Sequence, residues 1–237
     1  MTDRGRRAPK RLSRRSFLKG LGLAALALAS VPAYAIGVEP FRLVIKRYQV
    51  TPLRWPKDMP LRIAILADPH ICKPWLTVDH LAGIVERANA LKPDVFLLLG
   101  DYTIHHRWTS GQEPRAAWAA VLSRLEAPLG VHAILGNHDW WEDPQAQLTG
   151  TGLTRNGDAL MQAGIPVYHN KAARLQSDHG PFWLAGLGDQ IALRPDRNAN
   201  RSGFVGLHDL RGTLDQVTDT APVILLAHEP DIFPFVP

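Results

Sequence analysis

The chain has 237 residues, enough for one α/β domain with a hydrophobic core, and its single cysteine excludes an intrachain disulfide. The formal net charge of +5 comes from the N-terminus: residues 1–20 hold eight of the 27 Lys and Arg residues and one of the 22 Asp and Glu residues. The remainder therefore has a net charge of −2, so the basic isoelectric point does not indicate binding of nucleic acid.

The N-terminal 35 residues have the pattern of an export signal. Residues 13–19 (SRRSFLK) resemble the twin-arginine signal, residues 20–31 are apolar, and Ala33-Tyr34-Ala35 is a small-x-small cleavage site. A basic tail followed by a core helix is the alternative interpretation, and the apolar stretch is shorter than the ~20 residues of a membrane span. We expect a twin-arginine signal peptide or signal anchor over residues 1–35.

This signal has consequences for partners and location. We expect the twin-arginine export machinery to be a partner, and residues 20–35 to be the part that associates with a membrane if the signal is retained. The chain is then periplasmic or attached to the outer face of the cytoplasmic membrane.

The remaining chain divides by pattern into a connector and a main domain. Residues 36–60 are expected to form a strand (FRLVIKRYQV) and a proline-rich connector, and residues 61–237 the main domain. In chain order, the main domain has strands at 61–67, 95–99 and 131–135, separated by a helix that begins after Thr77 and by a helix over 112–126. A short helix at 156–163, short strands at 167–169, 173–176 and 182–187, a helix at 207–217 and a buried strand at 223–227 follow. The pattern predicts an α/β fold with two sheets packed face to face and flanked by helices.

Four polar motifs stand where four of the predicted strands end. They are Asp68-Pro69-His70, Gly100-Asp101, Gly136-Asn137-His138-Asp139 and Ala227-His228. Ligands of open α/β sheets bind at the carboxyl ends of the strands, so carboxylate, imidazole and amide groups should converge on one edge. We interpret this set as a metal site for two ions.

In this order, the motifs resemble the calcineurin-like metallophosphoesterase superfamily over about residues 61–228. The LRIAILADPH segment and the leader are similar to the exported or membrane-associated branch, which includes UDP-2,3-diacylglucosamine hydrolases. The resemblance implies a four-layer α/β/β/α sandwich. It also implies hydrolysis of phosphoester, phosphodiester or pyrophosphate bonds by a hydroxide that two metals activate, on a phosphorylated small molecule or lipid-linked substrate.

The resemblance also implies residue roles. Asp68 and His70 would bind one ion, Asp101 would bridge both ions, and Asn137 and His228 would bind the second. Mixed nitrogen and oxygen ligands suit Mn, Fe or Zn.

Two residues next to these ligands would have other roles. His138 would donate a proton to the leaving oxygen or stabilise phosphoryl charge, and Asp139 would orient the His138 ring.

The sequence departs from the family pattern at its C-terminal end. A G-H-x-H motif is expected shortly after His228, and none precedes Pro237. We therefore expect three protein ligands per ion and missing C-terminal strands. The alternative function is a truncated, non-catalytic exported protein that binds metal weakly or not at all.

Ordinary structural roles compete with the functional ones. Asp68 fits a turn, Asp101 a helix N-cap, residues 137–139 a turn and His228 a buried, backbone-satisfied imidazole. His105 and His106 fit a solvated loop or a substrate contact, His132 a structural role, Cys72 a small packed residue and Asp189 either a turn or the cleft. Trp75, Trp140 and Trp141 fit the core or a wall for an acyl or sugar group.

Overall fold

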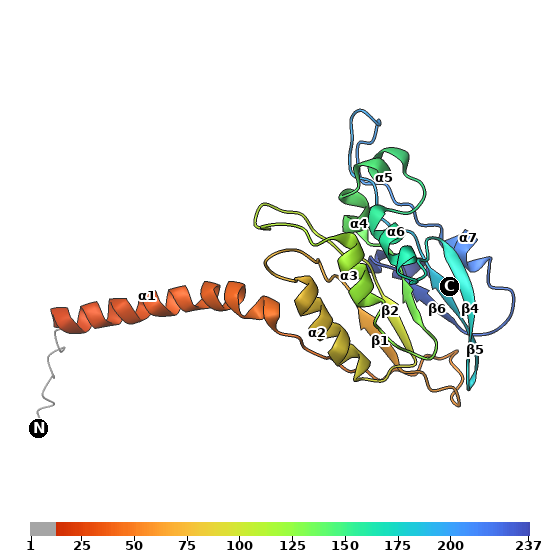
Figure 1. The fold of residues 1–237 in the computed structure, drawn as a ribbon, viewed down its shortest axis with the longest axis horizontal. Helices are drawn as coiled ribbons and strands as arrows, with labels where there is room; N and C mark the ends of the chain where they lie inside the picture. Colours follow the sequence, from red (N-terminus) through yellow and green to blue (C-terminus); the bar gives the residue numbers. More distant parts are fainter. Residues whose placement is uncertain (1–12) are drawn as a thin grey trace, which may run out of the picture. The chain divides into compact units, whose positions relative to one another are not determined.

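The computed structural model describes residues 13–237, and the chain divides into two compact units, residues 1–45 and 46–237 (Figure 1). The basic residues Arg4, Arg6, Arg7, Lys10 and Arg11 of the expected export signal lie outside the described residues.

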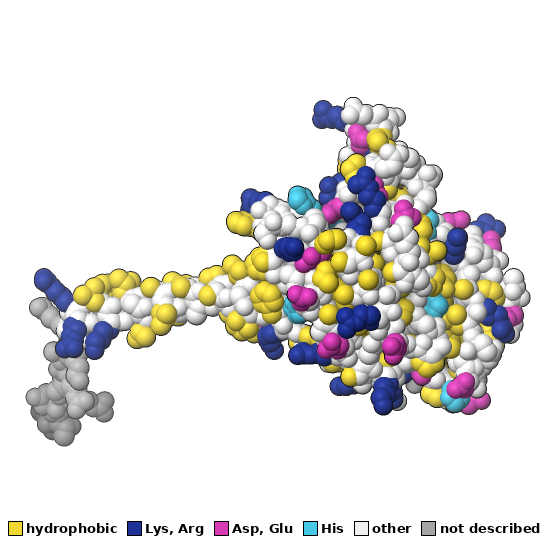
Figure 2. All heavy atoms as spheres, in the orientation of Figure 1, with side chains coloured by type: hydrophobic (Ala, Val, Ile, Leu, Met, Phe, Trp, Pro, Cys, Tyr) yellow, Lys and Arg dark blue, Asp and Glu magenta, His cyan; other side chains and the backbone are white. Residues whose placement is uncertain are grey.

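The described part of the first unit, residues 13–45, contains one long helix and one short helix. Helix α1 runs from Arg14 to Gly37 and begins after Ser13, whose side chain accepts a hydrogen bond from the Ser16 amide. The 3-10 helix η1 (Glu39–Phe41) follows. Helix α1 is longer than the apolar stretch of residues 20–31, and hydrophobic side chains cover much of its surface (Figure 2). By length and composition, the helical segment Arg14–Phe41 is able to cross a membrane.

The expected strand over residues 41–50 is wrong. Residues 42–50 have irregular backbone, and Val44, Tyr48 and Val50 are exposed. An apolar run with high β-propensity becomes a strand only where a neighbouring strand satisfies its backbone groups, and no strand of the described residues pairs with it.

A three-stranded parallel sheet begins the second unit. Its strands, in spatial order, are β1 (Ile63–Leu66), β2 (Val95–Leu98) and β3 (Val131–Ala133), with Ile63 opposite Val95 and Phe96 opposite Val131. Helices α2 (Val78–Asn89) and α3 (Arg115–Leu122) connect these strands. Thr77 caps α2 as predicted, because its hydroxyl accepts from the His80 amide. Helix α3 begins at Arg115 rather than at Gln112, because Pro114 with extended ψ stands at its N-cap, and it ends at Leu122, four residues earlier than predicted.

A second three-stranded sheet follows three short helices. The helices are α4 (Asn137–Trp141), α5 (Pro144–Thr149) and α6 (Arg155–Gln162), and the strands are β4 (Lys171–Ser177), β5 (Gly180–Gly186) and β6 (Val223–Leu226). Strands β4 and β5 form an antiparallel hairpin, and β6 pairs with β5 in parallel. Helix α7 (Leu210–Leu214) packs on β4 and β5. The 3-10 helix η2 (Pro230–Phe235) follows β6. The strand expected at 167–169 is reduced to a single bridge between Val167 and Ala133.

The hydrophobic core has two parts because β2 is buried on both faces. Phe96 and Leu98 belong to the cluster beneath the helices, which contains Trp118. Val95 and Leu97 belong to the cluster that joins the first sheet to Leu184 and Leu226 of the second sheet. The predicted α/β class, with two facing sheets and flanking helices, is confirmed (Figure 1).

His132 is structural, as predicted. It is buried in β3, Nε2 lies 2.8 Å from the Leu129 carbonyl oxygen, and Nδ1 lies 2.9 Å from the Tyr168 hydroxyl. The carbonyl requires a proton on Nε2, so Nδ1 accepts from Tyr168 and the neutral imidazole is satisfied. Burial lowers the pKa of His132 below its ordinary value of 6.5.

This environment predicts that acid destabilises the fold through His132. Its stabilising contribution is complete above pH 6.5 and is lost as the pH falls through the lower folded-state pKa, because the unfolded chain binds the proton first. Urea unfolding of the wild type and of His132→Gln between pH 7.5 and 5 measures this contribution. We expect a flatter pH profile for the variant, and parallel profiles would contradict the prediction.

Candidate metal centre

The predicted site residues come together where strands of both sheets end. Asp68 and His70 follow β1, Asp101 follows β2, Asn137 is the first residue of α4 after β3, and His228 follows β6. The His70 amide donates to the Asp101 carbonyl oxygen at 3.0 Å, which ties the first two loops together. The four motifs therefore converge as their positions at strand ends predicted.

The backbone at these loops has an uncommon conformation. Asp68, His70 and Asp101 have φ angles of 52°, 46° and 59°, in the left-handed region that non-glycine residues rarely occupy. Such a conformation costs on the order of 1–3 kcal/mol per residue and recurs at functional sites. At Gly136, a Cβ atom would collide with the Asp101 carboxylate and lie 2.6 Å from Cε1 of His228. Glycine at this position lets the backbone approach both side chains.

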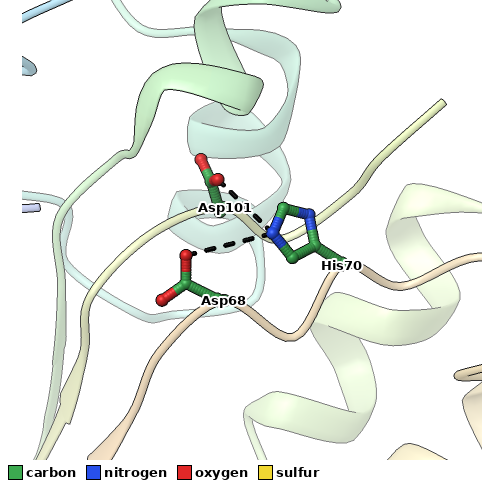
Figure 3. Close-up of side chains that lie close together, drawn as sticks. All are labelled: Asp68, His70 and Asp101. Atoms are coloured by element: carbon green, nitrogen blue, oxygen red, sulfur yellow. Dashed lines mark ion pairs between the residues drawn. The ribbon is translucent and has the colours of Figure 1, made fainter. Parts of the chain in front are cut away.

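The Asp101 carboxylate lies between two histidines. Its Oδ2 is 3.6 Å from Nε2 of His70, and its Oδ1 is 3.5 Å from Nε2 of His228. Asp68 Oδ1 is 3.9 Å from each of these two nitrogens, and Figure 3 shows Asp68, His70 and Asp101 pointing toward one another. Oδ1 of Asn137 is 3.1 Å from Nε2 of His228. All five predicted metal ligands therefore face one small region.

The donor set fits a cation. Nδ1 of His228 donates to the Leu99 carbonyl oxygen at 2.7 Å, so the lone pair of Nε2 faces the oxygens of Asp101, Asn137 and Asp68. Converging lone pairs repel one another unless a proton or metal ion lies among them. Carboxylate, amide and imidazole ligands are those that divalent ions such as Mn, Fe and Zn accept.

The pKa values reflect the same convergence of charge. Burial opposes protonation of His228, but the hydrogen bond and charge of Asp101, with the Leu99 carbonyl, raise its pKa to about 10. Burial raises the pKa of Asp101, and this is outweighed by His228 and the His138 amide, which lower it. Burial also lowers the pKa of His70. In the absence of metal, a proton on His228 thus balances the Asp101 carboxylate.

Asp139 does not orient the His138 ring, contrary to our prediction. Its buried carboxylate accepts hydrogen bonds from the backbone amides of Asp101 (2.9 Å), Tyr102 (3.0 Å) and Gly136 (2.9 Å), and from the side chain of Asn156 (2.8 Å). Burial raises the pKa of Asp139 to about 6, although these donors act to lower it. Asp139 points into the protein and holds together the loops that follow β2 and β3.

Glu142 is the carboxylate beside His138. Its Oε1 lies 3.4 Å from Nδ1 of His138 and also accepts a hydrogen bond from the His105 amide. The hydrogen bond to Glu142 is the main cause that raises the pKa of His138, against the lowering effect of burial. The i,i+4 spacing of the two residues across α4 is the sequence signal that would have found this pair.

Replacing Glu142 by glutamine is expected to lower the pKa of His138. The charge and the hydrogen bond that raise it are weakened, while the burial that lowers it remains. An NMR titration of the imidazole signals of the metal-free full chain measures this change, and His132, which does not contact Glu142, is the internal control. An unchanged titration of His138 would contradict the prediction.

Two further acidic residues, Asp189 and Glu229, lie next to His228. Asp189 is buried beside Glu229, and its Oδ1 accepts from the Ile191 amide at 2.9 Å, so the residue forms a buried turn. Burial and the neighbouring Glu229 raise the pKa of Asp189 to about 9. Both nitrogens of His228 are already engaged with Leu99, Asp101 and Asn137, so this group is not a separate metal site.

The remaining candidates occupy ordinary environments or border the site. Cys72 and Trp140 are buried, as expected for packed residues, and Trp75 is half-buried. His105 and His106 lie in the loop after β2, where His105 is exposed. Trp141 is half-buried, and its ring centroid is 5.1 Å from that of His138, so it borders the site.

Comparison with known proteins agrees with this geometry. A family model described as calcineurin-like phosphoesterase matches residues 61–233. The chain is 28% identical over 229 residues to "Uncharacterized metallophosphoesterase YkuE" of Bacillus subtilis, covering 94% of this chain and 71% of that protein. It is 29% identical to "Phosphodiesterase YaeI" of Escherichia coli, covering 84% and 70% of the two chains.

Some relatives are much longer than this chain. It is 30% identical to "Transmembrane protein with metallophosphoesterase domain" of Danio rerio, covering 72% of this chain and 35% of that protein. The chain also spans 65% of an Aquifex aeolicus metallophosphoesterase, so it covers less than two thirds of several relatives.

Proposed function

Since the chain belongs to the calcineurin-like phosphoesterase family and is a hydrolase of phosphoester bonds, we propose that it cleaves phosphodiester or pyrophosphate bonds with two divalent metal ions. Asp68, His70 and Asp101 would hold one ion, and Asp101, Asn137 and His228 the other. When bound, the ions would stabilise charge on the phosphoryl oxygens and lower the pKa of the attacking water.

One observation carries this proposal. The two oxygens of Asp101 face the Nε2 atoms of His70 and His228, one oxygen to each histidine, at 3.6 and 3.5 Å. A carboxylate placed in this way can serve two cations at once, as in two-metal hydrolytic sites. Its Oδ1 also accepts from the His138 amide at 2.8 Å, which fixes its orientation.

His138 would act as the proton donor to the leaving oxygen. Its ring lies edge-on to the His70 ring, with centroids 5.1 Å apart, so it is next to one of the proposed ligands. Glu142 favours its protonated form, because the hydrogen bond between them raises the pKa of His138. Glu142 thus acts as a positioning residue for the proton donor.

Two features suggest the class of substrate: the name of one relative and the export signal that the N-terminus resembles. A relative bears the name phosphodiesterase, and the leader resembles that of exported proteins, so we favour a phosphodiester or pyrophosphate in a lipid-linked precursor, such as a UDP-2,3-diacylglucosamine-like lipid. We propose that the chain leaves the cytoplasm by the twin-arginine route and acts in the periplasm or at the outer face of the membrane.

The proposed location predicts the effect of changing the arginine pair. Replacing Arg14 and Arg15 by lysine in the full chain should keep the protein in the cytoplasmic fraction, because twin-arginine export depends on the pair. Immunoblots of cell fractions measure this, and unchanged recovery from the periplasmic or membrane fraction would contradict the route.

The activity is tested with a generic substrate. The purified full chain is assayed for hydrolysis of bis(p-nitrophenyl) phosphate with added Mn²⁺, with a chelator, and with Mn²⁺ restored after chelation. We expect turnover that Mn²⁺ stimulates, that chelation abolishes and that restored metal recovers. A folded protein with no metal-stimulated turnover would contradict the proposed function.

A further inference from the structure

A row of aromatic rings extends from the candidate metal centre to the surface. The row consists of His138, Trp141 and Phe204, and the centroid distances are 5.1 Å from His138 to Trp141 and 5.4 Å from Trp141 to Phe204. The planes of Trp141 and Phe204 are inclined by only 28°, so these two rings stack. Cζ of Arg194 lies 4.5 Å from the centroid of Trp141, and Phe204 is 53% exposed.

Phe204, the outer ring of the row, belongs to an extended hairpin, which we call the arm (residues 193–205). At its base, the amides and carbonyls of Leu193 and Val205 pair in both directions at 2.9 Å. Figure 1 shows the tip of the arm projecting beyond α5. The arm thus brings Phe204 to a ring that is 63 positions earlier in the chain.

Hydrogen bonds from α4 and α5 hold the arm in place. Nε1 of Trp141 donates to the Ile191 carbonyl oxygen at 2.9 Å. Gln147 accepts from the Arg194 amide at 2.9 Å and donates to the Ala192 carbonyl at 2.7 Å, and its own carbonyl accepts from Arg201. The rings are therefore positioned before any ligand binds, which lowers the cost of binding.

The row connects the candidate metal centre to solvent, which is typical of a ligand-binding surface and not of the hydrophobic core. One end touches His138, whose ring lies next to the metal ligand His70, and the other end is an exposed Phe side chain. An exposed aromatic surface that continues from polar site residues is typical of a binding surface. Arg194 adds positive charge over the Trp141 ring, and its side chain is exposed.

We propose that the row of His138, Trp141 and Phe204 is a subsite for the organic group of the substrate, and that this group is planar, aromatic or unsaturated, and anionic. The proposal rests on the proposed function, because the phosphoryl group must lie at the metal centre beside His138. The planar group would stack on the exposed ring of Phe204, which itself stacks on Trp141, and Arg194 would face its negative charge.

Binding of inert phosphonates tests the subsite without turnover. Calorimetry with the full chain in Mn²⁺ compares phenylphosphonate with methylphosphonate, which share a head group and differ in the ring. We expect the phenyl compound to bind about tenfold more tightly to the wild type, because of stacking and apolar burial. Phe204→Ala should remove most of this preference and leave methylphosphonate binding unchanged. Tyr48→Ala, which removes an exposed aromatic side chain outside the row, should keep it.

The charge requirement is tested on the same proteins. A carboxyl group on the ring, as in 4-carboxyphenylphosphonate, should increase the affinity of the wild type for the ligand. Arg194→Gln should cancel this increase while the preference for phenyl over methyl remains. If Arg194→Gln retains the increase, Arg194 does not face the substrate and the anionic part of the proposal is overturned.

The outcomes separate this inference from the function on which it rests. If methylphosphonate binds only with Mn²⁺ and phenylphosphonate binds equally well, the metal centre stands and the subsite is overturned. A phenyl preference that persists in Phe204→Ala also overturns it. If neither phosphonate binds the Mn²⁺-loaded protein, the proposed function fails, and the subsite fails with it.

Discussion

Replacing Asp101 by asparagine is expected to lower kcat/KM for a phosphodiester by about a thousandfold, which corresponds to about 4 kcal/mol of transition-state stabilisation. Asparagine has nearly the same shape and its carbonyl oxygen can still accept from the His138 amide, which Asp101 Oδ1 does at 2.8 Å. Asparagine lacks the negative charge of the carboxylate and one of the two oxygens that face His70 and His228. The substitution therefore removes the proposed bridge between two ions while keeping the local packing.

The measurement combines kinetics with metal content. Steady-state rates with bis(p-nitrophenyl) phosphate are compared with the number of Mn²⁺ ions bound per chain, and we expect fewer bound ions in the variant. Asp94→Asn is the matched control, because Asp94 also accepts from a backbone amide, that of Arg62, just before β2 at the opposite end of that strand. A variant at position 101 that keeps the wild-type rate and metal content would show that Asp101 does not bridge metal ions.

Replacing Asp139 by alanine is expected to destabilise the metal-free fold by at least about 4 kcal/mol. The change leaves the buried amides of Asp101, Tyr102 and Gly136 without their acceptor, and also the side chain of Asn156, and each unsatisfied group costs on the order of 1–3 kcal/mol. This loss is a large fraction of the roughly 5–15 kcal/mol that stabilises an ordinary domain.

Urea unfolding without metal separates the two roles considered for Asp139. Asp158→Ala, an exposed acidic residue on α6, is the control and should change the stability little. If Asp139→Ala unfolds at the wild-type urea concentration but shifts the His138 titration, Asp139 orients that ring after all. A lower midpoint with the His138 titration intact supports the role that its hydrogen bonds indicate.

The fold and the position of the candidate site were predictable because both depend on local signals. Buried parallel strands are short apolar runs, and the polar residues after β1, β2, β3 and β6 follow the carboxyl ends of strands in both sheets, where the sheets bring them together. The prediction of a strand at 41–50 was wrong for the converse reason. Its β-propensity is local, but a strand requires a partner, and propensity carries no information about that partner.

The details of the site depend on contacts between distant segments, which no short motif contains. Asp139 stands next to His138, so sequence adjacency indicated the wrong partner, while the side chains of consecutive helical residues point in different directions. Its acceptor role depends on Asn156 and on the loop after β2, which are distant in the chain. The contact of Trp141 with Phe204 depends on an arm that Trp141 and Gln147 fasten through hydrogen bonds to the backbone at residues 191–192, about 45–50 positions later in the chain.

The way the arm is fixed has a consequence for how substrate preference changes during evolution. The groups that hold it are Trp141 and Gln147 on one side and, on the arm itself, the Leu193–Val205 pair and Arg201, so all of them lie outside residues 197–200. Residues 197–200 at its tip are exposed. Insertions, deletions and substitutions are tolerated best at such exposed tips. The tip can therefore be lengthened or replaced without moving Phe204 or the candidate metal ligands, so substrate preference can change while the hydrolytic chemistry is retained.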